Sequence, residues 1–252
     1  MGIAIVTGAS SGIGEGFCRR LDGLGLDSIW ITSRSAHRLE KLASQLKTPV
    51  RVVPCDLASQ DGLNSFVSEI CNESPSVDYL INCAGVGFFG DSWGIPSKNT
   101  ESMISLNISA LVAITDCCIP FMSEGSAVIQ MCSASAYLPL PYLNVYAATK
   151  SFVKSYCDGL RHELNGMGIR VLEVSPGWVS TAFISKSVED ADVPQRVFKH
   201  TVTVEQVVDE AFVDLEKGRD RSVCGCYNKF QVYMCRHLPS VAGAIWRHSL
   251  RL

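Results

Sequence analysis

The stretch IAIVTGASSGIG, residues 3–14, decides the fold of this chain of 252 residues. Its first part, Ile3–Val6, is a short uncharged run of mainly β-branched residues, which suits a strand buried on both faces of a parallel sheet. A glycine-rich turn follows and leads into a helical pattern that reaches Leu21. A strand, a glycine-rich turn and a helix in this order direct backbone N–H groups at a site where phosphate binds. The stretch therefore predicts an α/β fold with a nucleotide at its first βα turn.

Three glycines of this turn each meet a steric requirement of a bound pyrophosphate. Gly8 permits the tight turn, Gly12 lets the pyrophosphate approach the backbone, and Gly14 allows the helix to pack closely on the sheet. The residues expected around the phosphates are Thr7, Gly8, Ser10, Ser11, Gly12, Ile13 and Gly14. A turn with a purely structural role is the alternative.

The end of the second predicted strand, Ser28–Thr32, indicates which dinucleotide binds. An acid at this place holds the ribose hydroxyl of NAD, whereas a cation suits the 2′-phosphate of NADP. Here Ser33 and Arg34 follow the strand, and Arg38 lies one turn further on. Because an arginine fork matches a phosphate dianion, we expect NADP(H). A solvated loop charge is the alternative interpretation of Arg34.

Strands and helices alternate along most of the chain. Further strands are expected at 50–53, 77–81, 127–132 and 171–174, with a short last strand at 222–226. Helical patterns cover 38–46, 62–71, 99–122 and 146–164. A capping box, Thr203 with Gln206, opens another helix. This alternation predicts a single domain over residues 1–252, built on a Rossmann-type, doubly wound parallel sheet with helices on both faces.

Four polar residues form the candidate catalytic set. Tyr146 and Lys150, four apart on a predicted helix, share one face, so that an ammonium group lies near a phenol. A free phenol has a pKa of about 10, and a neighbouring positive charge lowers that pKa. Ser133 ends the fifth predicted strand, at the sheet edge where open α/β sheets bind ligands. Asn107 lies inside a long helical pattern, where a buried amide needs a partner.

The composition narrows the class of protein. A net charge of −3 disfavours general nucleic-acid binding. The 11 cysteines show no zinc-ligand spacing, so we expect no metal site and mostly buried, reduced thiols in a cytoplasmic protein. The apolar run directly after Met1 leaves no room for a signal peptide. Prolines interrupt the longest uncharged run, Gly125–Thr149, so a soluble protein is expected.

These motifs resemble those of the short-chain dehydrogenase/reductase family over about residues 1–181. They follow the family's order: Thr7-Gly8-x-x-x-Gly12-x-Gly14, Asp56-Leu57, Asn82-x-Ala84-Gly85, Asn107, Ser133, Tyr146-x-x-x-Lys150 and Pro176-Gly177-x-Val179-x-Thr181. Ser133 also stands thirteen residues before Tyr146, as the family pattern expects. Cys83 departs from the pattern, because the family more often has a second asparagine there, and this departure bears on the packing beside the cofactor.

The resemblance implies a strand order of 3-2-1-4-5-6-7, NAD(P)(H) as the cofactor, and a homodimer or homotetramer. It also implies that Tyr146 is the general acid in reduction and the base in oxidation. Ser133 would hold the substrate oxygen by a hydrogen bond. Lys150 would bind the nicotinamide ribose and lower the pKa of Tyr146, and Asn107 would hold a water that links Lys150 to solvent.

The same resemblance implies the remaining cofactor contacts. Asp56, beside Leu57, would meet the adenine. The segment that holds Asn82, Ala84 and Gly85 would pack by the adenosine ribose. Val179 and Thr181, which follow Pro176 and Gly177, would contact the nicotinamide amide.

Two further segments are expected to select the substrate. Residues 137–142, between Ser133 and Tyr146, are apolar, contain two prolines and would form one wall of the pocket. Residues 183–202 have no firm period, which is typical of a substrate lid. The expected pocket residues are Ser135, Leu138, Leu140, Tyr142, Trp178 and Phe183. They favour a hydrophobic substrate such as a steroid or bile acid, and this region resembles the hydroxysteroid dehydrogenase and 3-oxoacyl reductase branches of the family.

The C-terminal tail, residues 227–252, is both basic and apolar. From Lys217 onwards seven Lys and Arg accompany one acid, Asp220, so this part carries +6 and the remainder −9. Three interpretations stay open: a subunit contact or covering helix, a membrane-surface element, or attraction of an anionic substrate. The subunit contact or covering helix is favoured, and contact with a membrane surface is not expected.

We therefore predict an NADP(H)-dependent oxidoreductase that interconverts a hydrophobic ketone and a secondary alcohol. Reduction of a 3-oxoacyl thioester, or of a small carbonyl compound or sugar, is the alternative reaction. An NADP-binding sensor without turnover is a further alternative. Such a sensor has no need of the complete set Asn107, Ser133, Tyr146 and Lys150.

Overall fold

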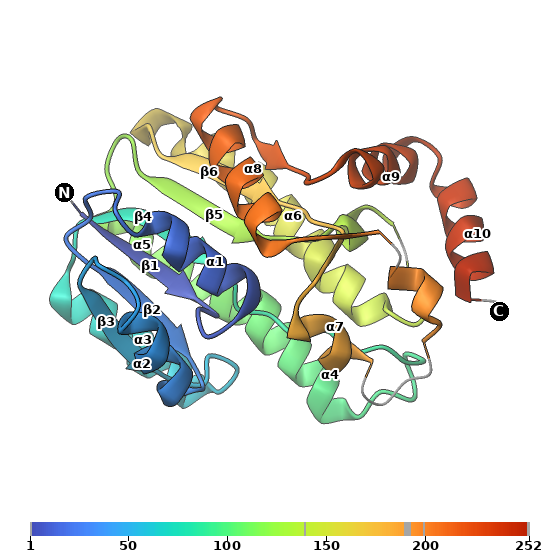
Figure 1. Ribbon diagram of the computed structural model, residues 1–252, viewed down its shortest axis with the longest axis horizontal. Helices are drawn as coiled ribbons and strands as arrows, with labels where there is room; N and C mark the ends of the chain where they lie inside the picture. The colour runs from blue at the N-terminus through green and yellow to red at the C-terminus, as the bar shows by residue number, and fades with distance from the viewer. Residues whose placement is uncertain (1, 139, 189–192, 199, 251–252) are drawn as a thin grey trace.

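A parallel seven-stranded sheet forms the centre of the computed structural model, which describes residues 2–138, 140–188, 193–198 and 200–250 (Figure 1). Its strands are β1 (Ile3–Thr7), β2 (Ile29–Ser33), β3 (Val50–Pro54), β4 (Val77–Asn82), β5 (Ala127–Met131), β6 (Arg170–Val174) and β9 (Arg221–Ser222). They lie in the order β3-β2-β1-β4-β5-β6-β9, which confirms the predicted topology, with β9 in the seventh place. Pro139 of the predicted pocket wall, residues 189–192 and 199 of the predicted lid, and residues 251–252 of the tail lie outside the described residues.

The last strand is displaced from its predicted position. It occupies Arg221–Ser222, where Arg221 pairs with Glu173 and Ser222 with Val174, instead of residues 222–226. The chain leaves the sheet after Ser222 because Gly225, with φ of 87°, turns it into the helix that starts at Cys226. A second, two-stranded parallel sheet joins β7 (Trp178–Val179) to β8 (Thr201–Val202).

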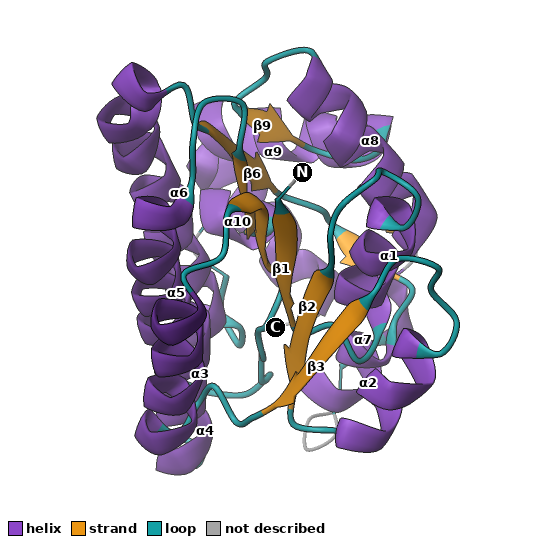
Figure 2. Ribbon diagram, turned by 90° about the vertical axis from the view of Figure 1, so that its left-hand side faces the viewer, coloured by secondary structure: helices purple, strands orange, loops and turns teal. Residues whose placement is uncertain are grey.

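Helices cover both faces of the main sheet, as the view along it shows (Figure 2). One face carries α1 (Gly12–Leu21), α2 (Ala36–Ala43) and α8 (Val204–Glu216), and the other carries α3 (Gln60–Glu73), α4 (Ser97–Ile104), α5 (Leu111–Cys118) and α6 (Asn144–Leu164). Alternate residues of β1 enter the two cores: Ala4 and Val6 pack under α1, whereas Ile3 and Ile5 pack under α3 and α5. All five residues of β1 are therefore buried, as its apolar sequence predicted.

The long helical pattern predicted over 99–122 is not one regular helix. It spans Ser97–Phe121 and contains a π-helical segment, η1 (Ser105–Ala110), between α4 and α5, with Asn107 inside it. By length and mean hydropathy, 1.7 over its most apolar part, this helical stretch among the described residues meets the criteria for a membrane span. In the fold it lies over the sheet between α3 and α6 (Figure 2).

The C-terminal third builds one end of the molecule. The predicted lid region holds α7 (Ala182–Ser187), a short 3₁₀ turn η5 (Gln195–Phe198) and β8. After β9 the chain forms two helices, α9 (Cys226–His237) and α10 (Pro239–Leu250), with Leu238 between them. These two helices, called here the C-terminal hairpin, lie at the end of the molecule opposite β3 (Figure 1).

Candidate active site

A cleft of about 860 Å³ runs along the carboxyl ends of the strands and brings together most of the predicted site residues. The predicted residues that line it are Gly8, Ser10, Ser11, Gly12, Ile13, Gly14, Ser33, Arg34, Arg38, Asp56, Leu57, Ala84, Gly85, Ser133, Ser135, Leu138, Leu140, Tyr146, Lys150, Pro176, Gly177, Trp178, Val179, Thr181 and Phe183. Since β2 and β5 are separated in the sheet by β1 and β4, Arg34 and Ser133 lie at different ends of this cleft.

Four predicted site residues do not line the cleft. Thr7 accepts a hydrogen bond from the Ala84 backbone N–H (3.1 Å), and Asn82 donates from its amide to Thr115 (3.1 Å). Both are buried, and they brace the strand ends on which the cleft rests. Asn107 is fully buried behind Gly85. Tyr142, expected in the pocket, has a left-handed backbone with φ of 66°, and its side chain packs against an apolar cluster instead.

The glycine-rich turn has the geometry of a phosphate cradle. Gly8 has φ of 68°, and a Cβ there would lie 2.8 Å from the Ala84 nitrogen. A Cβ on Gly14 would lie 2.4 Å from the Gly8 carbonyl oxygen, so the helix start can approach the turn only without a side chain. Ser11, the N-cap of α1, provides no side-chain cap, which leaves backbone N–H groups at the helix start for an anion. These residues fit a dinucleotide pyrophosphate.

The end of the cleft beside β2 is positively charged. Arg34 and Arg38 are exposed, line the cleft and take part in no ion pair within the described part of the chain. Ser33, where an acid would select against phosphate, is neutral. Asp56 lies near the end of β3 and accepts a hydrogen bond from the Ala58 N–H (3.1 Å). This end therefore suits an adenosine that carries a 2′-phosphate.

Tyr146 and Lys150 lie in the first two turns of α6, and both side chains are buried. The Lys150 Nζ is 5.7 Å from the centroid of the Tyr146 ring and donates a hydrogen bond to the Met131 carbonyl (2.7 Å). Ser133 follows the end of β5 beside them. The predicted pair therefore shares one helix face, with the serine hydroxyl at the strand end opposite.

The expected depression of the Tyr146 pKa is not what the structure of the protein chain alone favours. Burial raises the pKa of Tyr146 above its ordinary value, and the hydrogen bond with Ser133 offsets only part of that rise. Burial also lowers the pKa of Lys150, whose ammonium is directed at a backbone carbonyl. The lysine charge was expected to lower the Tyr146 pKa, but the loss of solvent around the buried phenol has the larger effect and raises it.

Asn107 is held by the protein on both sides of its amide. Its Oδ1 accepts from the Val86 N–H (2.9 Å), and its Nδ2 donates to the Val86 carbonyl (2.9 Å) and to the Thr149 hydroxyl (3.0 Å). The π-helical segment thus places this amide between the β4 loop and α6. The arrangement ties the segment beneath the cofactor end of the cleft to the helix that carries Tyr146.

The turn after Ser133 is fixed by several contacts. This turn is η3 (Ala134–Tyr137), and its first N–H donates to the Pro176 carbonyl (2.9 Å) while the Ser135 N–H donates to the Ser133 Oγ (3.2 Å). At its other end the Tyr137 hydroxyl donates to Oε1 of Glu173 (2.6 Å). Tyr137 does not line the cleft.

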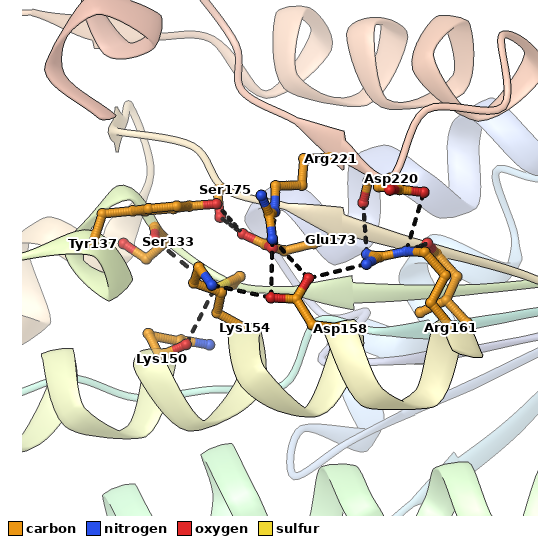
Figure 3. Close-up of polar contacts among 12 residues, drawn as sticks. Ser133, Tyr137, Lys150, Lys154, Asp158, Arg161, Glu173, Ser175, Asp220 and Arg221 are labelled. Atoms are coloured by element: carbon orange, nitrogen blue, oxygen red, sulfur yellow. Dashed lines mark hydrogen bonds and ion pairs between the residues drawn. The ribbon is translucent and has the colours of Figure 1, made fainter. Parts of the chain in front are cut away.

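Glu173 is the centre of a buried polar network that the sequence prediction missed (Figure 3). Its carboxylate is fully buried and accepts from Tyr137, from the Ser175 hydroxyl (2.6 Å) and from Nε of Arg221 (2.9 Å). Arg221 reaches on to Asp158 of α6 (2.6 Å), which also binds Lys154 and Arg161. A single acid within the apolar strand sequence 170–174 was the available signal, since a buried carboxylate requires partners.

Two cysteines beside the catalytic residues remain neutral. Cys83, the departure from the family pattern, lines the cleft, and burial raises its pKa to about 12. Burial likewise raises the pKa of Cys132 to about 12. Neither thiol is therefore suited to act as a nucleophile at neutral pH.

The substrate end of the cleft is apolar. The predicted residues Leu138, Leu140, Trp178 and Phe183 form one cluster there, together with Phe89, Met103, Leu143, Tyr146, Cys235 and Trp246. The C-terminal hairpin adds Gln231, Cys235 and Trp246 to the lining, and the Trp246 Nε1 donates to the Pro141 carbonyl (3.1 Å). Sequence reasoning did not assign these three residues, because no local pattern indicates a contact across 105 positions.

The hairpin also contacts the Pro176–Gly177 turn, which lines the cleft. The Asn228 side chain is buried against Gly177, where a Cβ would lie 2.2 Å from the Asn228 Oδ1. The Asn228 amide donates to the Cys224 carbonyl (2.7 Å), which fixes its orientation. The first turn of α9 is therefore locked to the Pro176–Gly177 turn.

Comparison with known proteins gives a consistent family. Residues 2–192 match the family model described as short chain dehydrogenase. A sulfoacetaldehyde reductase 2 from Chromohalobacter salexigens is 32% identical over 187 residues, which are 72% of this chain and 74% of that protein. The closed form of a serine dehydrogenase complexed with NADP+ is 28% identical, with a TM-score of 0.74 over 84% of this chain and 88% of that one. A 7beta-hydroxysteroid dehydrogenase, 22% identical, shares the fold with a TM-score of 0.81 over 98% and 96% of the two chains.

Proposed function

The chain belongs to the short-chain dehydrogenase family of oxidoreductases, and from this premise we propose that it uses NADP(H) to interconvert a hydrophobic ketone and a secondary alcohol. A steroid or bile acid is the substrate class that fits best. The observation that carries this proposal is the apolar end of the cleft. The charged side chains among the described residues that line the cleft are Arg34, Arg38, Asp56 and Lys150, and all four are predicted cofactor contacts.

The cofactor assignment is supported by the end of the cleft beside β2. Two exposed arginines, Arg34 and Arg38, have no carboxylate partner among the described residues, and they accompany a neutral Ser33 where an acid would favour NAD. The serine dehydrogenase that is 28% identical was solved with NADP+. When bound, the nicotinamide supplies or accepts the hydride, and the protein positions the reacting groups around it.

The residues of the chain divide the remaining chemistry among them. The Ser133 hydroxyl would hold the substrate oxygen, and the Tyr146 phenol would give it a proton in reduction or take one in oxidation. Because burial raises the Tyr146 pKa, the phenol is protonated at neutral pH, which is the form that donates to a carbonyl oxygen. Lys150 would leave the Met131 carbonyl or share its protons with the nicotinamide ribose.

A small polar carbonyl compound is the second candidate substrate, and the relationship to sulfoacetaldehyde reductase 2 is the observation in its favour. A sulfonate or carboxylate next to the reacting carbon would need a cation at the substrate end. None of the described residues that line that end provides one apart from Lys150. We therefore rank it below the hydrophobic ketone.

The decisive experiment measures NADPH consumption by the full chain over a panel of ketosteroids, oxo-bile acids, 3-oxoacyl thioesters, sulfoacetaldehyde and small ketones. We expect the highest kcat/KM with an oxo-steroid or oxo-bile acid, and a lower value with NADH than with NADPH. A preference for sulfoacetaldehyde or another small polar carbonyl would reject the hydrophobic assignment. A preference for NADH would reject the cofactor assignment.

A further inference from the structure

The C-terminal hairpin has two unlike faces. Its inner face buries Asn228, Cys235 and Trp246 against the body of the protein. The hairpin also exposes six large apolar side chains, each between 47% and 62% accessible: Tyr227, Phe230, Tyr233, Leu238, Val241 and Ile245. Tyr227 also stacks its ring on His200 outside the hairpin, with ring centroids 4.0 Å apart, and the other five form what we call its outer face. The three aromatic residues follow each other at intervals of three in α9, so they share one side of that helix. Exposed apolar side chains gathered on two neighbouring helices in this way mark a binding face.

The charge of the same segment points to the chemistry of its partner. In the sequence after Asp220 there is no Asp or Glu, but there are Lys229, Arg236, Arg247 and Arg251. Lys229 is ion-paired with Glu210 of α8, so it is not available to a partner. Arg236 is exposed and has no carboxylate partner within the described part of the chain. The rest of the protein is net negative. Aromatic rings interleaved with cations, without acids, complement an anionic lipid surface.

A second copy of the chain complements this face less well. In a two-fold contact the same patch is used on both partners, so the cations of one hairpin would be brought near those of the other. The hairpin supplies no acid to pair with them, and like charges brought together oppose association. An anionic bilayer provides both the missing negative charge and an apolar layer for the rings.

We propose that the outer face of the C-terminal hairpin binds the surface of an anionic phospholipid membrane. The hairpin forms one end of the molecule (Figure 1), so it can contact a flat surface without obstruction from the sheet. Its inner face lines the apolar end of the cleft through Gln231, Cys235 and Trp246. If the proposed hydrophobic substrate is correct, the docked enzyme would receive that substrate directly from the lipid.

Vesicle sedimentation with the full chain tests this proposal without cofactor or substrate, so its outcome is independent of the proposed reaction. Vesicles of phosphatidylcholine alone are compared with vesicles that also contain about 30% phosphatidylglycerol, an anionic fraction high enough for surface potentials to act. We expect the protein to sediment with the anionic vesicles and to remain largely in solution with the neutral ones. The bound fraction should fall as salt shortens the Debye length to about 3 Å near 1 M.

Variants with substitutions on the outer face test whether that face is the part of the protein that binds the vesicles. The double variant Phe230→Ser/Tyr233→Ser should weaken binding to anionic vesicles at least about tenfold, because two rings lose their contact with lipid. Arg236→Gln should weaken it about fivefold, as expected for one cation at an anionic surface. Phe152→Ser removes a comparably exposed ring from α6 and should leave binding unchanged. All three replaced aromatic side chains are substantially exposed, so thermal unfolding should confirm that the variants are folded.

Two results would overturn the proposal. The first is a wild-type protein that sediments no better with anionic vesicles than with neutral ones. The second is a double variant that retains vesicle binding but loses an oligomer in light scattering, which would identify the face as a subunit contact.

Discussion

At the scale of single residues, burial has more influence on the catalytic phenol than the lysine below it. Tyr146 is 9% exposed, and the Lys150 ammonium, 5.7 Å from the centroid of the Tyr146 ring, donates to the Met131 carbonyl. The pair is nevertheless on one helix face, as its spacing predicted. The protein alone therefore presents a neutral phenol.

Replacement of Tyr146 by phenylalanine tests its assignment as the proton donor. The substitution removes one oxygen and keeps the ring contact with Phe183. We expect kcat to fall about a hundred- to ten-thousand-fold, the range of general acid–base catalysis, with little change in the Kd for NADPH. Tyr142→Phe removes a hydroxyl that does not line the cleft and serves as the control. Near-normal turnover by Tyr146→Phe would require another proton donor.

Replacement of Arg34 by alanine tests the assignment of the cofactor. Arg34 is expected to donate charge-assisted hydrogen bonds to the 2′-phosphate, each of which contributes about 1.5–3 kcal/mol. The KM for NADPH should therefore rise about ten- to a hundredfold, while that for NADH should hardly change. Lys41→Ala removes an exposed cation of α2 outside the cleft and should affect neither value. Equal effects of Arg34→Ala on both cofactors would remove Arg34 from phosphate recognition.

The residues that could be assigned from the sequence alone lie close to one another along the chain. Strand, glycine turn and helix are adjacent in the chain, and the Tyr–Lys pair needs only one helix, so short patterns predict both. Glu173, Gln231 and Trp246 depend on contacts between distant segments, and no pattern of 3.6 or two residues reveals them. Tyr142, expected in the pocket, packs against the apolar cluster of the substrate end but does not line the cleft, and its spacing along the chain could not distinguish these two positions.

At the scale of secondary-structure elements, η3 is the turn that fixes Ser133, the residue proposed to hold the substrate oxygen. It begins directly after Ser133 and ends at Tyr137, whose hydroxyl is tied to the buried carboxylate of Glu173 (Figure 3). The Ser151 hydroxyl of α6 donates to the Ala136 carbonyl (3.0 Å), which holds the middle of the turn. The turn is thus clamped between β6 and the helix that carries the catalytic pair.

Tyr137→Phe tests whether this tether positions the active site. Loss of the hydroxyl leaves Glu173 with one donor fewer, at a cost of about 1–3 kcal/mol in the free energy of unfolding. We also expect kcat to fall at least about tenfold, because small displacements of a reacting group are costly, while the KM for NADPH stays unchanged. Ser175→Ala is the matched control, since its hydroxyl donates to the same Glu173 oxygen but belongs to no part of η3. If both variants lose similar stability and Tyr137→Phe keeps its kcat, the tether is structural only.

In the long helical segment, the apolar periodicity predicts the helix but not the irregular turn inside it. Its apolar pattern predicts one helix and gives the ends to within two residues, Ser97–Phe121 against 99–122. The π-helical segment around Asn107 adds a residue to one turn, and an apolar pattern does not register such a change. The asparagine itself was the signal, because its amide reaches Val86 and Thr149 only from that widened turn.

At the scale of the whole molecule, the ion pairs around Asp158 join α6 to β6 and β9 and should govern acid stability. Burial alone would raise the pKa of Asp158, but hydrogen bonds from Lys154 and Arg161 and the charge of Arg221 lower it from 3.8 to about 2. A carboxyl group whose pKa is lower in the folded than in the unfolded state stabilises the protein at every pH above the unfolded-state pKa. That contribution is lost as pH falls from about 3.8 to 2.

Asp158→Asn is therefore expected to lower the Tm at pH 5 to 7. The difference in Tm from the wild type should shrink as pH falls below 3.8, because the wild-type carboxyl then becomes protonated as well. Asp209→Asn, at an exposed position that makes no ion pair among the described residues, is the control and should show no such trend. Thermal unfolding followed by circular dichroism between pH 7 and pH 2.5 measures both. A constant difference across that range would show that Asp158 acts through packing and not through its charge.

The contact between Gly177 and Asn228 has a consequence for exchange of parts between relatives. The family match ends at residue 192, so the C-terminal hairpin lies beyond it. Yet the hairpin meets the Pro176–Gly177 turn so closely that no side chain fits at position 177. A hairpin taken from a relative would pack in the same place only if the residue at its position 228 fitted against a glycine at position 177. Hybrids that join the core of one relative to the C-terminal segment of another should therefore fold poorly at this contact unless the residues at positions 177 and 228 come from the same protein.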